Sequence, residues 1–287
     1  MTSTATTTKR TPSTLRRGIR RGFILWAIVS TAWLANSVRT QGVDPHVLQS
    51  SAAVTVLDGS TTLEFSPSAG NSDTALIFIC GSGVTAEAYA PLLRPIAEAG
   101  YSVFVVRLPL RFAPLESHKQ EAVRRAIGLI HDHPEISRWV VSGHSLGAAL
   151  ACRVVRSNSA SVDGLVLVGT THPKQDDFSG LQIPVTKVYA LNDGIARPAD
   201  VLSHKDLLPD RTRWVEITGG NHSQFGHYGH QLFDRTPTIS RKQQQHIARS
   251  ALMDAILNLD EDPVEQSHAP EPAAGSVSSG ASSLPAR

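Results

Sequence analysis

Short apolar runs alternate with longer segments of helical periodicity along most of this 287-residue chain. Residues 75–80 contain no charged or hydroxyl side chain, as expected of a strand that is buried on both faces of a sheet. The helical pattern after this run ends at Gly100, a residue that commonly stops helices. Such alternation predicts an α/β fold with a mostly parallel central sheet flanked by helices. The expected strands are 54–58 and 62–65 (a hairpin), 75–80, 102–106, 139–142, 165–168, 185–190 and 213–218, and the expected helices are 86–99, 117–133, 146–156, 198–205 and 240–259.

The pentapeptide Gly143-His144-Ser145-Leu146-Gly147 follows one of these strands and precedes an alanine-rich helix. A serine between two such glycines, on a sharp turn from strand to helix, is the pattern of a catalytic nucleophile. The glycines relieve the crowding of the turn, and the helix N-terminus lies close to the charge that develops during attack. We therefore expect Ser145 to be a nucleophile. His144 adjoins it in sequence, and we expect this histidine to be structural.

A serine nucleophile needs a base and a carboxylate, which follow it along the chain in the order acid, then histidine. Asp193 comes directly after the expected strand 185–190 and precedes Gly194, which permits a tight turn. We expect Asp193 to be the acid. The competing carboxylates are those of Asp176, Asp177 and Asp200.

The last expected strand leads into Gly219-Gly220-Asn221-His222, a flexible turn that can carry a histidine over the sheet edge. We expect His222 to take the proton of the serine hydroxyl as it attacks. The acid then fixes the tautomer of the imidazole and stabilises its cation. His227 and His230 are the nearby alternatives.

An attacked carbonyl also needs two backbone donors for its developing oxyanion. One is expected to be the N–H of Leu146, directly after the nucleophile. The other should come from the glycine-rich loop after strand 75–80, where the N–H of Ser82 is the first choice and those of Gly83 and Val84 are the alternatives.

The N-terminus differs from the rest of the chain. Residues 1–43 hold seven of the 27 basic residues and no acid, and residues 22–38 are a 17-residue run without charge. The basic flank predicts a transmembrane or signal-anchor helix over 22–38, with the catalytic domain outside the cytoplasm in a single-pass cell-membrane protein. A cleaved signal peptide, with secretion, and an amphipathic or buried helix are the alternatives. The expected organisation is a disordered basic segment 1–21, the helix 22–38, a linker 39–52, a domain 53–260 and a disordered tail 261–287.

Charge and cysteine content exclude some other classes of protein. Outside the leader, 20 basic residues stand against 25 acidic ones, so a basic patch for nucleic acid is not expected. Cys80 and Cys152 both lie in apolar surroundings, which predicts two buried free thiols.

With these motifs together, residues 52–260 resemble the α/β-hydrolase superfamily. Within it the chain looks like a bacterial group of small, membrane-anchored hydrolases related to the dienelactone-hydrolase-like branch. The resemblance lies in four stretches, which are 86–92, 143–147, 219–226 and 238–241. It implies esterase-type hydrolysis with no metal and no organic cofactor. Dienelactone hydrolases use a cysteine where this chain has Ser145, so the resemblance does not extend to their substrate.

The expected activity is therefore hydrolysis of a small-molecule carboxylic ester, thioester or lactone through an acyl-enzyme at Ser145. A cofactor-free acyltransferase or perhydrolase, and a non-catalytic surface binding protein, are the alternatives. Only about fifteen residues separate the expected strands 165–168 and 185–190, too few for a cap domain. We expect an open site, with walls from residues 107–116 and 225–235.

Overall fold

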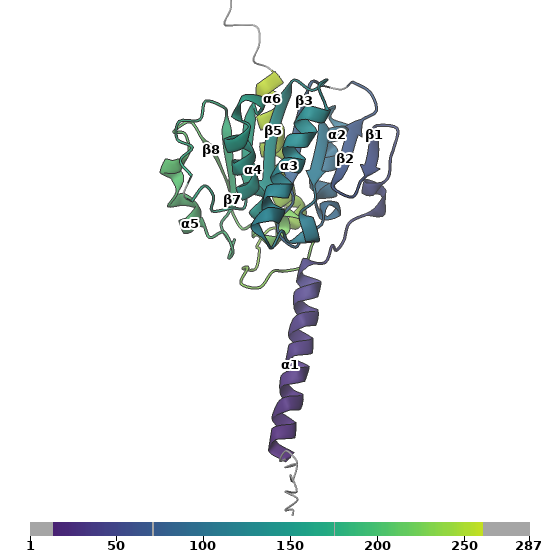
Figure 1. The fold of residues 1–287 in the computed structure, drawn as a ribbon, viewed down its shortest axis with the longest axis vertical. Helices are drawn as coiled ribbons and strands as arrows, with labels where there is room; N and C mark the ends of the chain where they lie inside the picture. Colours follow the sequence, from purple (N-terminus) through teal and green to yellow (C-terminus); the bar gives the residue numbers. More distant parts are fainter. Residues whose placement is uncertain (1–13, 71, 175, 261–287) are drawn as a thin grey trace, which may run out of the picture.

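The computed structural model describes residues 14–260, except 71 and 175. Its strands form one eight-stranded sheet in the order β1-β2-β4-β3-β5-β6-β7-β8 (Figure 1). The hairpin strand β2 is antiparallel to β1 and β4, and all other neighbours are parallel. The predicted α/β fold is confirmed. The strands are β1 (Val54–Asp58), β2 (Thr62–Pro67), β3 (Thr74–Ile79), β4 (Ser102–Val106), β5 (Arg138–His144), β6 (Gly164–Val168), β7 (Val185–Ala190) and β8 (Arg213–Ile217).

Helices cover both faces of this sheet. The helices α2 (Ala90–Glu98) and α6 (Arg241–Asp260) contact each other on one face, while α3 (Glu116–Asp132) and α4 (Leu146–Ser157) contact each other on the opposite face (Figure 1). A short helix, α5 (Pro198–Leu202), follows β7 in the chain. The expected helix 86–99 begins instead as a 3₁₀ turn over Ala86–Tyr89 and becomes α-helical only at Ala90.

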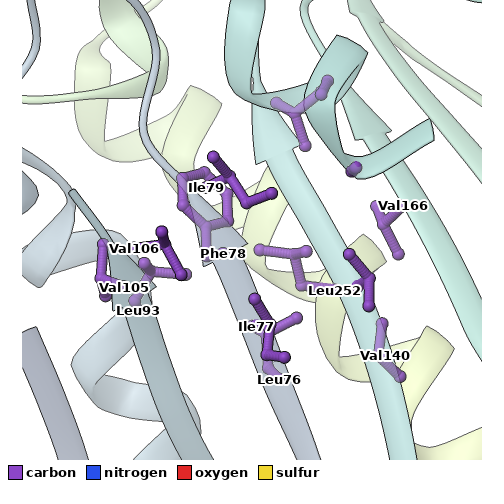
Figure 2. Close-up of a cluster of buried hydrophobic side chains, with 14 of the residues drawn as sticks. Leu76, Ile77, Phe78, Ile79, Leu93, Val105, Val106, Val140, Val166 and Leu252 are labelled. Atoms are coloured by element: carbon purple, nitrogen blue, oxygen red, sulfur yellow. The ribbon is translucent and has the colours of Figure 1, made fainter. Parts of the chain in front are cut away.

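The core lies between the central strands and the two helical layers. Every residue of β3 is buried, and Leu76, Ile77, Phe78 and Ile79 pack with apolar side chains of the neighbouring strands and helices (Figure 2). Burial of one such side chain contributes about 1.5–3 kcal/mol to the free energy of folding. This two-sided burial explains why the central strands are continuous apolar runs in the sequence.

The structure agrees with two further expectations, one about the cap region and one about the cysteines. Between Val168 and Val185 the described residues form no helix, so no cap domain stands over the carboxyl edge of the sheet at this point. Cys80 and Cys152 are buried and free, as predicted. Burial raises the pKa of the Cys152 thiol to about 12, which keeps this thiol protonated.

The N-terminal helix α1 (Thr14–Val38) projects from the domain, and most of its apolar side chains are exposed (Figure 1). It begins eight residues before the expected start at 22. No helix among residues 14–260, with the two gaps noted, combines the length and the hydropathy needed to cross a membrane. The predicted transmembrane or anchor helix is therefore not supported, because the apolar run is only 17 residues long and is bounded by Arg21 and Arg39.

The expected linker 39–52 is ordered against the domain. The buried guanidinium of Arg94 on α2 donates hydrogen bonds to the carbonyl oxygens of His46, Val47 and Gln49 at 2.6–3.2 Å, and to the hydroxyl of Ser51 at 2.9 Å. One side chain thus binds three backbone carbonyls of this segment, which contains a 3₁₀ turn over Pro45–Leu48. The segment that leads from α1 into β1 is therefore part of the folded unit.

A buried lysine in β7 gives the fold a pH dependence. Lys187 is 1% exposed, and its ammonium group donates a hydrogen bond to the carbonyl of His172. Burial lowers the pKa of Lys187 from 10.5 to about 7. Between these two pH values the unfolded chain binds a proton that the folded chain does not, so this group makes folding more stable as pH rises from about 7 toward 10.5.

We expect Lys187→Met to raise the free energy of unfolding by about 1–3 kcal/mol at pH 7, because it removes the cost of neutralising a buried amine. The gain should shrink toward pH 10. Urea denaturation at several pH values measures both effects, with exposed Lys205→Met as the matched control. An equal change in both variants, or a gain that is constant with pH, would contradict the assignment.

Candidate active site

Ser145 occupies the sharp turn between β5 and α4. Its backbone angles are φ 56° and ψ −117°, a conformation that costs a non-glycine residue about 1–3 kcal/mol. The turn is held by a hydrogen bond from the Ser145 N–H to the carbonyl of Val168 on β6, at 3.0 Å. The structure thus places a strained, half-buried serine at the carboxyl end of a central strand.

The two glycines beside this turn are required by close backbone contacts. A Cβ atom on Gly147 would lie 2.0 Å from the carbonyl oxygen of Ile79 on β3, and one on Gly143 would lie 2.4 Å from the carbonyl carbon of Gly147. Any side chain at either position would force the backbone apart. These contacts bring the first turn of α4 directly against the end of β3, whose following loop carries Ser82.

Asp193 and His222 meet at the same edge of the sheet. Asp193 follows β7 and His222 follows β8, and both side chains are 1% exposed. Oδ2 of Asp193 accepts a hydrogen bond from Nδ1 of His222 at 2.7 Å. The other carboxylate oxygen accepts from the N–H groups of Ile195 and Ala196 at 2.8 and 2.6 Å. Because an ionised carboxylate only accepts, Nδ1 is the donor, and in the neutral imidazole Nε2 then carries the lone pair.

Nε2 of His222 is buried, and no hydrogen-bond partner for it is found among the described residues. The expected acid, Asp193, is therefore hydrogen-bonded to the expected base, His222. No hydrogen bond between the Ser145 hydroxyl and His222 is found among the described residues. Catalytic hydrogen bonds are often long or poorly aligned until substrate binds. The free lone pair on Nε2 is the feature that a general base needs.

The loop after β3 narrows the choice of oxyanion donors. The N–H of Gly83 donates to the carbonyl of Arg111 at 2.9 Å, and that of Val84 donates to the carbonyl of Gly81 at 3.1 Å. Both alternatives are thus already engaged within the fold. The N–H groups of Ser82 and Leu146 have no acceptor among the described residues, so both are available to an oxyanion.

His144 lies close to the candidate catalytic groups, which its position in the sequence did not indicate. Its ring packs 4.5 Å from that of His222, centroid to centroid. The hydroxyl of Tyr89 accepts a hydrogen bond from the N–H of Gly81 at 3.1 Å and shares a second hydrogen bond of 2.9 Å with Nδ1 of His144. Burial and the neighbouring His222 hold the pKa of His144 well below its ordinary value. His144 is therefore a neutral packing residue that ties the loop after β3 to the turn.

The remaining candidates have other partners. Asp176 pairs with Arg156, and Asp200 pairs with Arg197 at 2.8 Å. Asp177 accepts a hydrogen bond from the N–H of Ser179. The ring of His230 lies 3.1 Å from the carbonyl of Asp234, and the backbone of His227 donates to the carbonyl of Ala88. None of these five residues is paired with the carboxylate or the imidazole described above.

Asp234 is a residue of this site that sequence reasoning missed. Its Oδ1 accepts from the N–H groups of Gly194 and His222, at 3.1 and 3.2 Å. Its Oδ2 accepts from the N–H and the hydroxyl of Ser223, at 2.8 and 2.7 Å. One carboxylate therefore ties the loop of Asp193 to the loop of His222. No strand or motif marks this position, so the sequence gives no signal for it.

We expect Asp234→Ala to lower kcat about 10- to 100-fold, because the imidazole loses the support that aims it. The free energy of unfolding should fall by about 2–3 kcal/mol, since several N–H groups lose a charged acceptor. Asp234→Asn keeps one acceptor oxygen and should lose less of both. Ester turnover and urea denaturation measure the two effects. A loss of stability with kcat unchanged would show that the carboxylate supports the fold and not the imidazole.

The site holds no arrangement for a metal in the described part of the chain, where no group of three or more His, Cys, Asp or Glu side chains could bind one. The chemistry available is that of a hydroxyl, an imidazole, a carboxylate and backbone N–H donors.

Comparisons with known proteins agree with this architecture. The fold is similar to that of a ferulic acid esterase from Streptomyces cinnamoneus, with a TM-score of 0.54 and 17% identity over 67% of this chain and 68% of that one. It is also similar to a putative hydrolase from Agrobacterium vitis S4 (TM-score 0.51, 14% identity, 71% and 98% of the two chains). A predicted CIB-like hydrolase from Thermoplasma acidophilum gives a TM-score of 0.51 at 15% identity, over 70% and 97% of the two chains.

At these identities the similarity concerns the fold alone. No curated protein sequence is significantly similar to this chain. Residues 75–246, which run from β3 into α6, match the alpha/beta hydrolase family. This match spans more than half of the chain and includes the turn at Ser145 and the residues Asp193 and His222. The chain belongs to the alpha/beta hydrolase family.

Proposed function

We propose that this protein is a serine hydrolase that cleaves carboxylic esters, with thioesters and lactones as related substrates, through an acyl-enzyme at Ser145. The observation that carries the proposal is the buried hydrogen bond between Asp193 and His222, which leaves the lone pair on Nε2 of the imidazole free. The strained turn that bears Ser145 supports it, because such a turn exposes a serine hydroxyl at the carboxyl edge of the sheet.

The proposed reaction has two halves. In the first, Oγ of Ser145 attacks the ester carbonyl while Nε2 of His222 takes the hydroxyl proton. The oxyanion accepts hydrogen bonds from the N–H groups of Ser82 and Leu146, each worth roughly 3 kcal/mol in the transition state. The imidazolium then gives its proton to the leaving alcohol. In the second half, water attacks the acyl-enzyme, His222 again takes and returns the proton, and the carboxylic acid leaves.

The role of Asp193 is to hold the imidazole in the reactive tautomer and to stabilise the imidazolium. Its second oxygen is held by two backbone N–H groups, so the carboxylate cannot turn away from the ring. The export of the domain stays a prediction.

Partitioning of the acyl group tests the proposed intermediate. In buffer containing methanol, p-nitrophenyl acetate and phenyl acetate should give the same ratio of methyl acetate to acetate, because both pass through one acetyl-enzyme. A ratio that changes with the leaving group would contradict a common acyl-enzyme. Failure of the folded protein to cleave any activated ester would contradict hydrolysis itself.

A further inference from the structure

An open groove of about 460 Å³ lies between the end of α1 and the loops at the carboxyl edge of the sheet. Leu34, Ala35 and Val38 of α1 form one wall. The other walls are formed by Phe112, Ile195 and Leu232. None of the described residues that line the groove is charged, and the polar side chains among them are two hydroxyls and one amide, those of Thr31, Ser37 and Gln231.

The groove adjoins three loops that carry candidate catalytic groups, namely those of Ser82, Asp193 and His222. On the side of the expected oxyanion donor, the hydroxyl of Ser82 donates to the carbonyl of Phe112 at 3.1 Å. On the acid side, the N–H of Ile195 donates to Asp193. A substrate held in this groove would therefore lie beside the loops that hold the donor and the acid.

The third loop is connected through Gln231, whose N–H donates to the hydroxyl of Ser223 at 3.0 Å, next to His222 in the chain. Ser223 is itself bound to Asp234. The wall formed by Gln231 and Leu232 is thus continuous with the loop that carries the base.

The end of α1 is fixed to this edge by hydrogen bonds. The guanidinium of Arg111 donates both to the carbonyl of Val38, the last residue of α1, and to that of Gly83 in the loop after β3. The hydroxyls of Thr40 and Thr85 share a hydrogen bond of 2.7 Å, and the N–H of Gln41 donates to the carbonyl of His227 at 2.8 Å. The helix end is therefore a fixed wall of the groove.

One face of α1 supplies this wall. Residues 31, 34, 35 and 38 recur at helical spacing and so share a face. Val29 and Trp33 lie on the opposite face and are exposed. The same helix therefore has one face that lines the groove and an opposite apolar face that does not. Substitutions on the second face can serve as controls for substitutions on the first.

We propose that this groove binds the apolar chain of the ester substrate, so that the end of α1, which precedes the family-matched residues 75–246, is a wall of the substrate site. The inference rests on the proposed hydrolysis at Ser145. An apolar chain fits because the described lining is mostly apolar and offers no charged partner for an ionic group, whose lost hydration would be poorly compensated. Burial of the chain lowers the free energy of the bound ester in proportion to the apolar area covered.

The test is a homologous series of p-nitrophenyl esters, from acetate to dodecanoate, with a parallel series of acetate esters of longer alcohols. We expect kcat/KM to rise about fourfold for each methylene that the groove buries, in the series whose chain enters it. Ala35→Trp fills the groove and should lower kcat/KM for the octanoate, or for the matching octyl ester, at least tenfold. The loss of kcat/KM for p-nitrophenyl acetate, whose acyl chain is too short to fill the groove, should be several-fold smaller than the loss for the octanoate.

Val29→Trp adds the same bulk to the opposite face of α1 and serves as the control, with an unchanged chain-length profile. Leu34→Asp is a second groove variant, in which a charge replaces an exposed apolar side chain, and it should flatten the profile without filling the groove. The proposal is supported if kcat/KM rises with chain length in the wild type and in Val29→Trp but not in Ala35→Trp or Leu34→Asp.

A short methyl fluorophosphonate separates the two hypotheses. If this probe labels the wild type but both ester series are flat, or if neither groove variant changes the profile, the groove assignment is overturned while the hydrolase remains. If the probe labels no residue of the folded protein, the proposed hydrolysis itself fails.

Discussion

Ser145→Ala is expected to lower kcat for ester hydrolysis by at least about 10⁴-fold, because the residual backbone donors and imidazole cannot form an acyl-enzyme. The fold should tolerate this change. Ser145 holds a positive φ of 56°, which alanine adopts at a similar cost, and its N–H still reaches the carbonyl of Val168. Steady-state turnover of p-nitrophenyl acetate, with circular dichroism to verify folding, measures the effect.

Ser142→Ala is the matched control for this variant. Ser142 lies on β5, the strand that leads into Ser145, and is buried, and its hydroxyl has no hydrogen-bond partner among the described residues. Its removal should leave turnover within about twofold of the wild type. A folded Ser145→Ala protein that retains a tenth or more of the activity would show that another group is the nucleophile.

Asp193→Asn is expected to lower kcat about 10⁴-fold at neutral pH. Two backbone N–H groups, from Ile195 and Ala196, already bind Oδ1 of Asp193, so the amide oxygen of the asparagine should stay there. The amide nitrogen then faces Nδ1 of His222 and donates to it. The imidazole proton must move to Nε2, and the ring can no longer accept the serine proton.

Asp200→Asn serves as the control, because Asp200 lies on α5 and pairs with Arg197. It should have wild-type kinetics. Turnover of p-nitrophenyl acetate by the two variants, with KM and kcat separated, measures the contrast. Because the wrong tautomer of His222 cannot accept the serine proton but still leaves the substrate site intact, kcat should fall while KM changes little. An Asp193→Asn protein within tenfold of the wild-type kcat would contradict it.

The parts of this site that follow from local sequence could be predicted. The turn at Ser145 needs glycines on both sides because α4 packs directly against the carbonyl of Ile79, and this requirement is visible as a spacing of residues. Asp193 and His222 each follow a strand, and the carboxyl ends of parallel strands meet at one edge of a sheet. Their hydrogen bond could thus be expected from order and position alone.

The support around the site could not be predicted in the same way. Asp234 lies between β8 and α6, in a segment without periodicity, and its contacts depend on how two distant loops fold against each other. The engagement of the Gly83 N–H likewise depends on the path of residues 109–113, because the carbonyl that accepts from it belongs to Arg111.

The N-terminal helix shows a different limit. An uncharged run after basic residues indicates that a helix seeks apolar surroundings, and the sequence alone favoured a membrane. The run is too short between its flanking arginines, and the end of the helix lies against the loops of the site. The sequence could not indicate this position, because nothing in residues 22–38 specifies which surface their apolar side chains meet.

The proposed hydrolysis requires that Ser145 is the residue that becomes acylated. Mass spectrometry of the full-length protein after reaction with a fluorophosphonate tests it most directly. Trypsin should release residues 139–153 as one peptide, in which fragment ions distinguish Ser142 from Ser145. We expect one phosphonyl group for each protein molecule, on Ser145, and none in Ser145→Ala. An adduct on any other residue, or none on the folded wild-type protein, would contradict it.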